Sequence, residues 1–270
     1  MTTTDRRAAL RAGAGLVAGG ALAAGCASAS GSTERPTATH PTATHPTATA
    51  ATPGPARGTP RAAPAPRAFP RQPAQISHGP RDRARVALTF HGQGDPALAR
   101  ALLTEAERHG ARVTVLAVGS WLDEHPEMAR RILDGGHDLG NHTQHHISVN
   151  TLSEAAARAE ITDCADRLHR LTGSIGSWFR PSRAQRAAPL VERLARAAGY
   201  PHVLSYDVDS LDYTRPGAPA VTRKVLAEVT GGSVVSLHFG YPDTVTALPD
   251  VLEELGRRGL RAVTTTELLS

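Results

Sequence analysis

Short apolar runs alternate with amphipathic stretches from Arg85 to the end of the chain, about seven times in all. The runs RVALTF, RVTVLAVG and SVVSLHF are rich in β-branched residues, which is typical of strands. Between such runs apolar residues recur at helical spacing, and Ser153 is a candidate cap for a helix over 153–171. Further strands are predicted in SWFRPS, HVLSYDVDS and LRAVTTTEL, and further helices in LDEHPEMARRILDGG and over 95–109, 218–230 and 243–258. This order predicts parallel strands joined by helical crossovers, in an α/β sheet or barrel.

The first 80 residues lack this pattern. They hold 11 of the chain's 20 prolines and few large apolar side chains, so they cannot bury enough surface to offset the conformational entropy of folding. A five-residue repeat, PTATHPTATHPTATA, leads into a Pro/Ala/Arg tract and predicts an extended spacer. We therefore predict a disordered linker over 30–77, followed by one folded domain over 78–270.

The charge is unevenly distributed between these two parts. The chain carries a net charge of +5, while its first 80 residues hold eight arginines against two acidic residues. The basic excess therefore lies in the tail, and the folded part is close to neutral. A high isoelectric point often indicates nucleic-acid binding, but this domain offers no electrostatic case for it. We expect no nucleic-acid partner.

Residues 1–29 have the layout of an export signal. Arg6 and Arg7 precede a mildly apolar stretch that is too short and too rich in glycine to remain as a membrane span. LAAGC resembles a lipoprotein box, in which Cys26 becomes the lipidated membrane anchor. The alternative is cleavage after the small residues 27–29, which yields a free secreted protein. We favour lipidation, and in either case we expect the protein at the outer face of the membrane, in the cell wall or outside the cell. The chain has only two cysteines, so Cys164 is left without a disulfide partner.

Polar side chains follow several predicted strands at the point where each strand ends. Such residues converge on one rim of a parallel sheet or barrel, where catalytic groups are found. Within NHTQHH, His142 and His146 are four residues apart, so on a helical turn their imidazoles would face the same way and bind one divalent ion. The residues at predicted strand ends are His91, His142, Arg180, Asp209, Asp212 and His238.

Five segments in this order carry a family resemblance: TFHGQGDP, NHTQHH, FRPSR, DSLDY and LHF. Over about residues 84–269 the chain resembles the polysaccharide deacetylases, the nodulation-deacetylase homology domain of carbohydrate esterase family four. The resemblance implies a distorted (β/α) barrel of about seven strands that removes acetyl groups from N-acetylated sugars. In that family one Asp and two His hold a metal ion, a carboxylate serves as the base, and a late histidine protonates the leaving amine.

Matched positions carry these roles over to the present chain. His142 and His146 are implied as ligands of a divalent ion, with zinc the expected metal. His238 is implied as the general acid, oriented by Asp212 or Asp209, because a neighbouring carboxylate fixes the tautomer of an imidazole and raises its pKa.

The first motif departs from the family pattern. His91 stands where the family has its catalytic Asp, and Gly92 stands where it has its metal-binding Asp. Arg180 would then pair with His91, which is either the base or itself a metal ligand. Asp95 is a second candidate for the missing ligand. Alternatively, Asp95 caps the helix that begins at Pro96, since proline is favoured at the first helical position.

Two classes of function follow. The first is an exported, metal-dependent hydrolase, expected to be monomeric, that removes N-acetyl groups from a peptidoglycan-like or chitin-like glycan. The second is a catalytically silent member that binds glycan without cleaving it, and the loss of both motif aspartates supports it. A different amide substrate is a third hypothesis, because Ser182 and Arg183 replace the family's proline and aromatic residue in the substrate-facing wall.

Overall fold

The computed structural model describes residues 63–270. The predicted export signal over 1–29, its Cys26, and the linker up to residue 62 lie outside the described residues. The strands are β1 (Gln75–Ile76), β2 (Arg85–Gly92), β3 (Thr114–Ala117), β4 (Asp138–Asn141), β5 (Val203–Leu204), β6 (Val208–Asp209), β7 (Val234–His238) and β8 (Arg261–Ala262). The helices are α1 (Pro96–Arg108), α2 (Gly119–Glu124), α3 (Glu127–Asp134), α4 (Glu154–Thr172), α5 (Pro189–Ala197), α6 (Ala218–Glu228), α7 (Pro242–Arg257) and α8 (Thr265–Leu269), with 3₁₀ turns η1 (Val149–Thr151) and η2 (Asp212–Thr214).

A parallel sheet in the order β4-β3-β2-β7-β6 forms the centre of the domain, and β8 pairs with the start of β2. β1 pairs in parallel with β5. Phe179 forms bridges to Asn141 of β4 and to Val203 of β5, which links the two sets of strands. The segment 203–209 is therefore connected to the β4 edge at its start through Phe179, and at its end it forms the other edge as β6, paired with β7. The result is the predicted α/β architecture, a parallel sheet curved into a distorted barrel.

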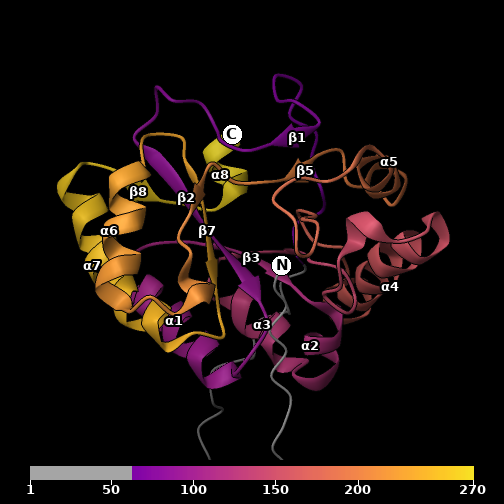
Figure 1. Ribbon diagram of the computed structural model, residues 1–270, viewed down its shortest axis with the longest axis horizontal. Helices are drawn as coiled ribbons and strands as arrows, with labels where there is room; N and C mark the ends of the chain where they lie inside the picture. Colours follow the sequence, from indigo (N-terminus) through magenta and orange to yellow (C-terminus); the bar gives the residue numbers. More distant parts are fainter. Residues whose placement is uncertain (1–62) are drawn as a thin grey trace, which may run out of the picture. The chain divides into compact units, whose positions relative to one another are not determined.

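Helices cover the outside of this sheet. In Figure 1, α6 and α7 lie side by side on one side of the central strands, and α4 and α5 lie on the other side. β2 is buried along nearly its whole length, which explains its uninterrupted apolar sequence, because a parallel strand is covered on both faces. None of the helices within 63–270 is long and apolar enough to cross a lipid bilayer.

Most predicted elements are confirmed, with local differences. The strand predicted in HVLSYDVDS is two short strands, β5 and β6. The single helix predicted in LDEHPEMARRILDGG is two helices, α2 and α3, separated at His125 and Pro126. SWFRPS contributes only the bridges of Phe179 rather than a strand. TTTEL forms the helix α8 instead of extending the last strand, because Thr264 and Glu267 form a reciprocal capping box that starts a helix there.

The domain begins before residue 78, which corrects the predicted linker boundary. Phe69 stacks on Trp178 with ring centroids 5.6 Å apart, and its backbone N–H donates to Nε2 of His202 at 2.9 Å. Ile76 is fully buried and pairs with Leu204 of β5. These contacts tie residues 63–77 to the folded part, although proline-rich sequence surrounds the few apolar side chains that make them.

Candidate metal centre and active-site cavity

His91 lies at the end of β2, directly opposite His238 of β7 in the strand register. Its Nε2 lies 3.1 Å from Oγ of Ser236 and 3.4 Å from Nη1 of Arg180. Among residues 63–270 its other ring nitrogen, Nδ1, has no hydrogen-bond partner. Burial is the main cause that lowers the pKa of His91 well below its usual value, and electrostatic repulsion from His142 is the second. Its imidazole is therefore neutral at neutral pH.

His142 and His146 come from the loop after β4, and this loop is not a helical turn. Thr143 and His146 both have left-handed backbone, with φ values of 67° and 55°. The side chain of Asn141 accepts a hydrogen bond from the backbone N–H of Thr143 at 2.8 Å and so fixes the start of the loop. The expected proximity of the two histidines is therefore present, but a tight loop produces it. Their ring centroids are 4.9 Å apart.

His142 has the features of a metal ligand. Its Nδ1 lies 3.0 Å from the carbonyl oxygen of Arg180, and a carbonyl can only accept, so Nδ1 carries the proton. The other nitrogen, Nε2, is then an acceptor, and it is buried without any hydrogen-bond partner in the described part of the chain. A buried polar atom without a partner costs free energy, and metal-bound histidines commonly donate their second nitrogen to a backbone carbonyl in this way. These observations fit a metal ion at Nε2.

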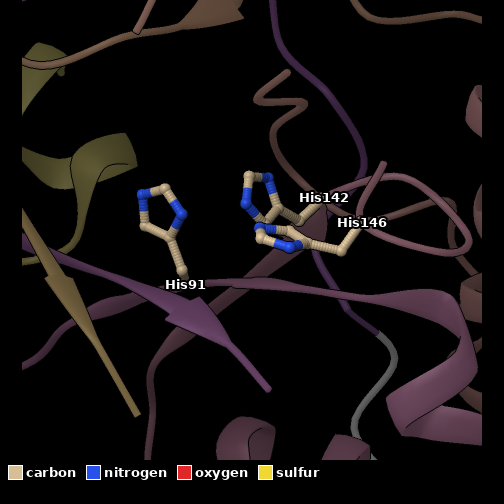
Figure 2. A group of neighbouring side chains, drawn as sticks. All are labelled: His91, His142 and His146. Carbon is tan, nitrogen blue, oxygen red and sulfur yellow. The ribbon is translucent and has the colours of Figure 1, made fainter. Parts of the chain in front are cut away.

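His91, His142 and His146 together form a group whose candidate ligand atoms all lie within 4.8 Å of one another. Figure 2 shows the three imidazoles turned toward a common space, His91 from the end of β2 and the other two from the loop. Burial, with a further effect from Arg183, lowers the pKa of His146 to about 4, and burial also lowers that of His142. Neutral imidazoles are the form that binds zinc and related divalent ions.

Asp95 does not belong to this group. Its carboxylate accepts a hydrogen bond from the backbone N–H of Ala97 at 2.8 Å, and Pro96 follows as the first residue of α1. The structure thus places Asp95 as the N-cap of α1, and His91 takes the third position of the cluster. Gly92 also has no room for a ligand side chain, since an added Cβ would lie 2.8 Å from the Val115 side chain and 3.0 Å from the Ala117 backbone.

His238 and Asp212 form a hydrogen-bonded pair beside the histidine cluster. Oδ1 of Asp212 accepts from Nδ1 of His238 at 2.6 Å, and Oδ2 accepts from the backbone N–H of the same residue at 2.8 Å. Thr244 donates to the same carboxylate at 2.7 Å. The His238 ring lies 4.2 Å from that of His91, centroid to centroid. Of the two carboxylates proposed to orient His238, Asp212 makes the contact; Asp209 faces the cavity instead.

Arg180 lies fully buried beneath His91. Its Nε and Nη2 donate to the backbone carbonyls of Leu204 and Ser205 at 3.1 Å and 3.0 Å, and the guanidinium lies 5.3 Å from the ring centre of Tyr206. Burial lowers the pKa of Arg180 to about 10, so it remains a cation at neutral pH. Its third nitrogen, Nη1, is the one that points to His91, as the resemblance implied for the group at that position.

A cavity of about 360 Å³ opens above these residues. The sequence analysis did not single out its tyrosines. Tyr213 and Tyr241 follow predicted strand ends as the candidate residues do, whereas Tyr206 lies within the strand predicted in HVLSYDVDS. Tyrosine rings combine an apolar face with a polar hydroxyl, and such surfaces suit ligands that are part apolar and part polar. The residues that line the cavity include His91, His146, His238, Tyr206, Tyr213 and Tyr241.

Comparisons with known proteins agree with this architecture. A family model described as polysaccharide deacetylase matches residues 78–203. A peptidoglycan-N-acetylglucosamine deacetylase of Bacillus cereus is 30% identical over 194 residues, which cover 70% of this chain and 90% of that protein.

Two solved structures are similar in fold and sequence. The crystal structure of a peptidoglycan N-acetylglucosamine deacetylase in complex with an N-hydroxybenzamide superposes with a TM-score of 0.68 and 26% identity, over 72% of this chain and 92% of that one. A carbohydrate esterase family 4 pseudoenzyme from Bacillus anthracis gives a TM-score of 0.69 and 26% identity, over 74% and 70%. The chain belongs to the polysaccharide deacetylase family.

Proposed function

We propose that this protein is a metal-dependent hydrolase that removes N-acetyl groups from an amino-sugar glycan. The observation that carries the proposal is the juxtaposition, in one cavity, of a three-histidine cluster and a histidine oriented by a buried carboxylate. His91, His142 and His146 are the proposed ligands, with zinc as the expected ion. The similarity to peptidoglycan-N-acetylglucosamine deacetylases supports an N-acetylated glycan as substrate.

His91, His142 and His146 would hold the divalent ion, which would supply Lewis-acid polarisation of the amide carbonyl and an activated water. For His91 to offer a lone pair from Nδ1, its Nε2 must carry the proton, and Oγ of Ser236 at 3.1 Å is placed to accept it. In this tautomer Nη1 of Arg180, 3.4 Å away and able only to donate, makes no hydrogen bond to Nε2. This second hydrogen bond would orient the ring, as outer partners of metal-bound histidines generally do.

His238 is the proposed general acid. The bond to Asp212 holds the proton on Nδ1, so that Nε2 is the atom that exchanges a proton with substrate. When Nε2 is protonated, the imidazolium lies against a carboxylate that stabilises its charge, and it can give this proton to the leaving amine. Asp212 itself is fully buried and acts through His238.

The proton of the attacking water needs another acceptor, because His91 is assigned to the ion. Asp209 is the carboxylate that lines the cavity among the described residues. It lies close enough to Arg180 and Tyr206 to influence their titration. We assign Asp209 the role of base, in place of the aspartate that the family carries at the position of His91.

Cellular location is also part of the proposal. Arg6, Arg7 and the mildly apolar stretch that follows support export, and LAAGC supports lipidation of Cys26. The proposed location of the protein is the outer face of the membrane or the cell wall, where a glycan substrate of this class is found.

Glycan binding without hydrolysis is the second candidate function. Its support is specific: both motif aspartates are absent, replaced by His91 and Gly92, and one of the similar solved structures is described as a pseudoenzyme. This alternative needs no proton donor, and the closely bonded His238 and Asp212 speak against it.

The deciding experiment measures acetate released by the purified protein from chitooligosaccharides and from peptidoglycan fragments, after loading with zinc and again after chelation. Metal-dependent release with about one ion bound per chain supports the hydrolase. Binding of the same oligosaccharides without release, by protein that does hold the ion, supports the second candidate.

A further inference from the structure

Two arginines without an ion-pair partner in the described part of the chain lie at or beside the cavity. Arg183 lines the cavity, and Arg215 lies over Tyr241 on the cavity wall, with its guanidinium carbon 5.8 Å from the ring centre. Both residues are exposed. Within residues 63–270 neither has an ion pair or a side-chain hydrogen bond. Other exposed arginines of this range, Arg186 among them, also lack such partners, so these two are distinguished by their place at the cavity and beside its tyrosine wall.

Arg183 and Arg215 are also among the few residues with a strained backbone conformation. In the described part of the chain, five residues other than glycine have a left-handed backbone, and all five belong to segments that build the site. Such a conformation is unfavourable for a residue with a Cβ and tends to persist where function requires it. Arg183 and Arg215 have φ values of 53° and 56°; the other three are Thr143, His146 and Leu211.

The charges that face the cavity are predominantly positive. Arg183 lies close enough to His146 to lower its pKa, and Arg180 lies below the floor. The single opposing carboxylate among the described lining residues is Asp209, and its electrostatic influence falls on Arg180 and Tyr206. A neutral sugar would leave the two exposed guanidinium groups without any partner but water.

We infer that Arg183 and Arg215 form an anion subsite that selects an N-acetylated glycan carrying a carboxylate or phosphate group beside the acetylated sugar. The inference rests on the proposed function for the acetylated sugar itself. A guanidinium presents a planar pair of N–H groups that matches the two oxygens of a carboxylate or phosphate. Tyr241, beneath Arg215, offers its ring face to the sugar and keeps that guanidinium in place by a cation–π contact.

Calorimetric titration of the full chain tests this without depending on hydrolysis. Three ligands of equal length are compared: a neutral N-acetylglucosamine disaccharide, the same disaccharide with an N-acetylmuramic acid unit, which adds one carboxylate, and the neutral disaccharide bearing one phosphate. At least one anionic ligand should bind about tenfold more tightly than the neutral one. The preferred ligand identifies the source of the anion, and its advantage should shrink as the salt concentration rises.

Matched variants assign the effect to the subsite. Arg183→Gln and Arg215→Gln should each remove most of the affinity difference between the anionic and the neutral ligand, and Arg183→Lys should retain part of it. Arg186→Gln is the control, because Arg186 is an exposed arginine three positions along the chain that does not line the cavity.

Equal affinity of the parent protein for all three ligands overturns the inference, as does an equal loss in the Arg183 and Arg186 variants. Preferential anion binding without acetate release supports the subsite and contradicts only the hydrolase proposal.

Discussion

Asp212 holds His238 through two different oxygens, one on the imidazole Nδ1 and one on the backbone N–H of the same residue. The ring and the main chain that carries it are thus fixed by one buried carboxylate. A hydroxyl from α7, that of Thr244, adds a third bond. This arrangement leaves Nε2 as the exchangeable nitrogen, and it lies at the end of a strand paired with the strand of His91.

The first prediction concerns this pair. Asp212→Asn replaces an acceptor by a group that can donate to Nδ1, which favours the wrong tautomer of His238. The rate of acetate release should fall by at least about a hundredfold, the usual contribution of a positioned general acid. Zinc content should remain that of the parent, because Asp212 makes no contact with the three-histidine cluster. A variant that loses the ion, or that keeps nearly full activity, contradicts the assigned role.

Metal binding separates the two candidates for the third ligand. His142→Ala removes the buried Nε2 and should abolish stoichiometric zinc binding, measured by elemental analysis after dialysis. Asp95→Ala should keep the ion and instead lose about 1 kcal/mol of unfolding free energy, the usual effect of removing a helix cap. His91→Ala should weaken zinc binding strongly. Loss of zinc in the Asp95 variant with retention in the His91 variant would reverse our assignment.

Replacement of Asp209 tests its assignment as the general base. Asp209→Asn keeps the size of the side chain but cannot accept the water's proton, so acetate release should drop by about a hundredfold or more while zinc stays bound. Asp163→Asn, at an exposed position of α4, serves as the control. Unchanged activity in the Asp209 variant would return the role of base to His91.

The stability of the metal-free protein should depend on pH in a defined direction. The pKa of His146 is lowered from 6.5 to about 4 by folding, so between these values the unfolded chain binds more protons than the folded one. The contribution of His146 is therefore present above pH 6.5 and is lost as the pH falls toward 4. Urea unfolding of chelated protein should show this decline, and His146→Asn should reduce it. His169→Asn, at an exposed histidine of α4, should not.

The revised start of the domain can be tested by truncation. A chain that begins at residue 78 loses the stacking of Phe69 on Trp178 and the pairing of β1, and should unfold at lower denaturant concentration than one that begins at residue 63. Phe69→Ala alone should lower the unfolding free energy by about 3 kcal/mol, whereas Arg71→Ala, at an exposed position, should have little effect. Equal stability of both chains would restore the boundary at 78.

Much of the fold was predictable because its signals are local. β2 is an apolar run since both faces are covered, and Ser153 caps α4 through a bond to Ala156 that its sequence position suggests. The start of the domain was not predictable in this way. Phe69 reaches a tryptophan more than a hundred residues away, and no local pattern in a proline-rich stretch reports such a contact.

The residues of the site could largely be predicted from the sequence, but the backbone geometry that brings them together could not. The spacing of His142 and His146 indicated that both bind one metal ion, but the left-handed backbone that brings them together is a property of the folded loop. Asp95 satisfied two interpretations equally well, and only the position of its carboxylate against Ala97 separated them. The anion subsite that we infer likewise draws Arg183 and Arg215 from two loops that are distant in sequence.

The segment 203–209, which joins both edges of the sheet, has a consequence for folding. Its ends pair with different strands, and between them it carries Tyr206 and leads to Asp209. The pairings that close the barrel therefore also position residues of the cavity wall, so a state in which this segment is unpaired lacks part of the cavity. A ligand that contacts this part of the cavity wall would bind only the closed barrel. By mass action it would therefore stabilise the pairings of the segment 203–209 against local unfolding.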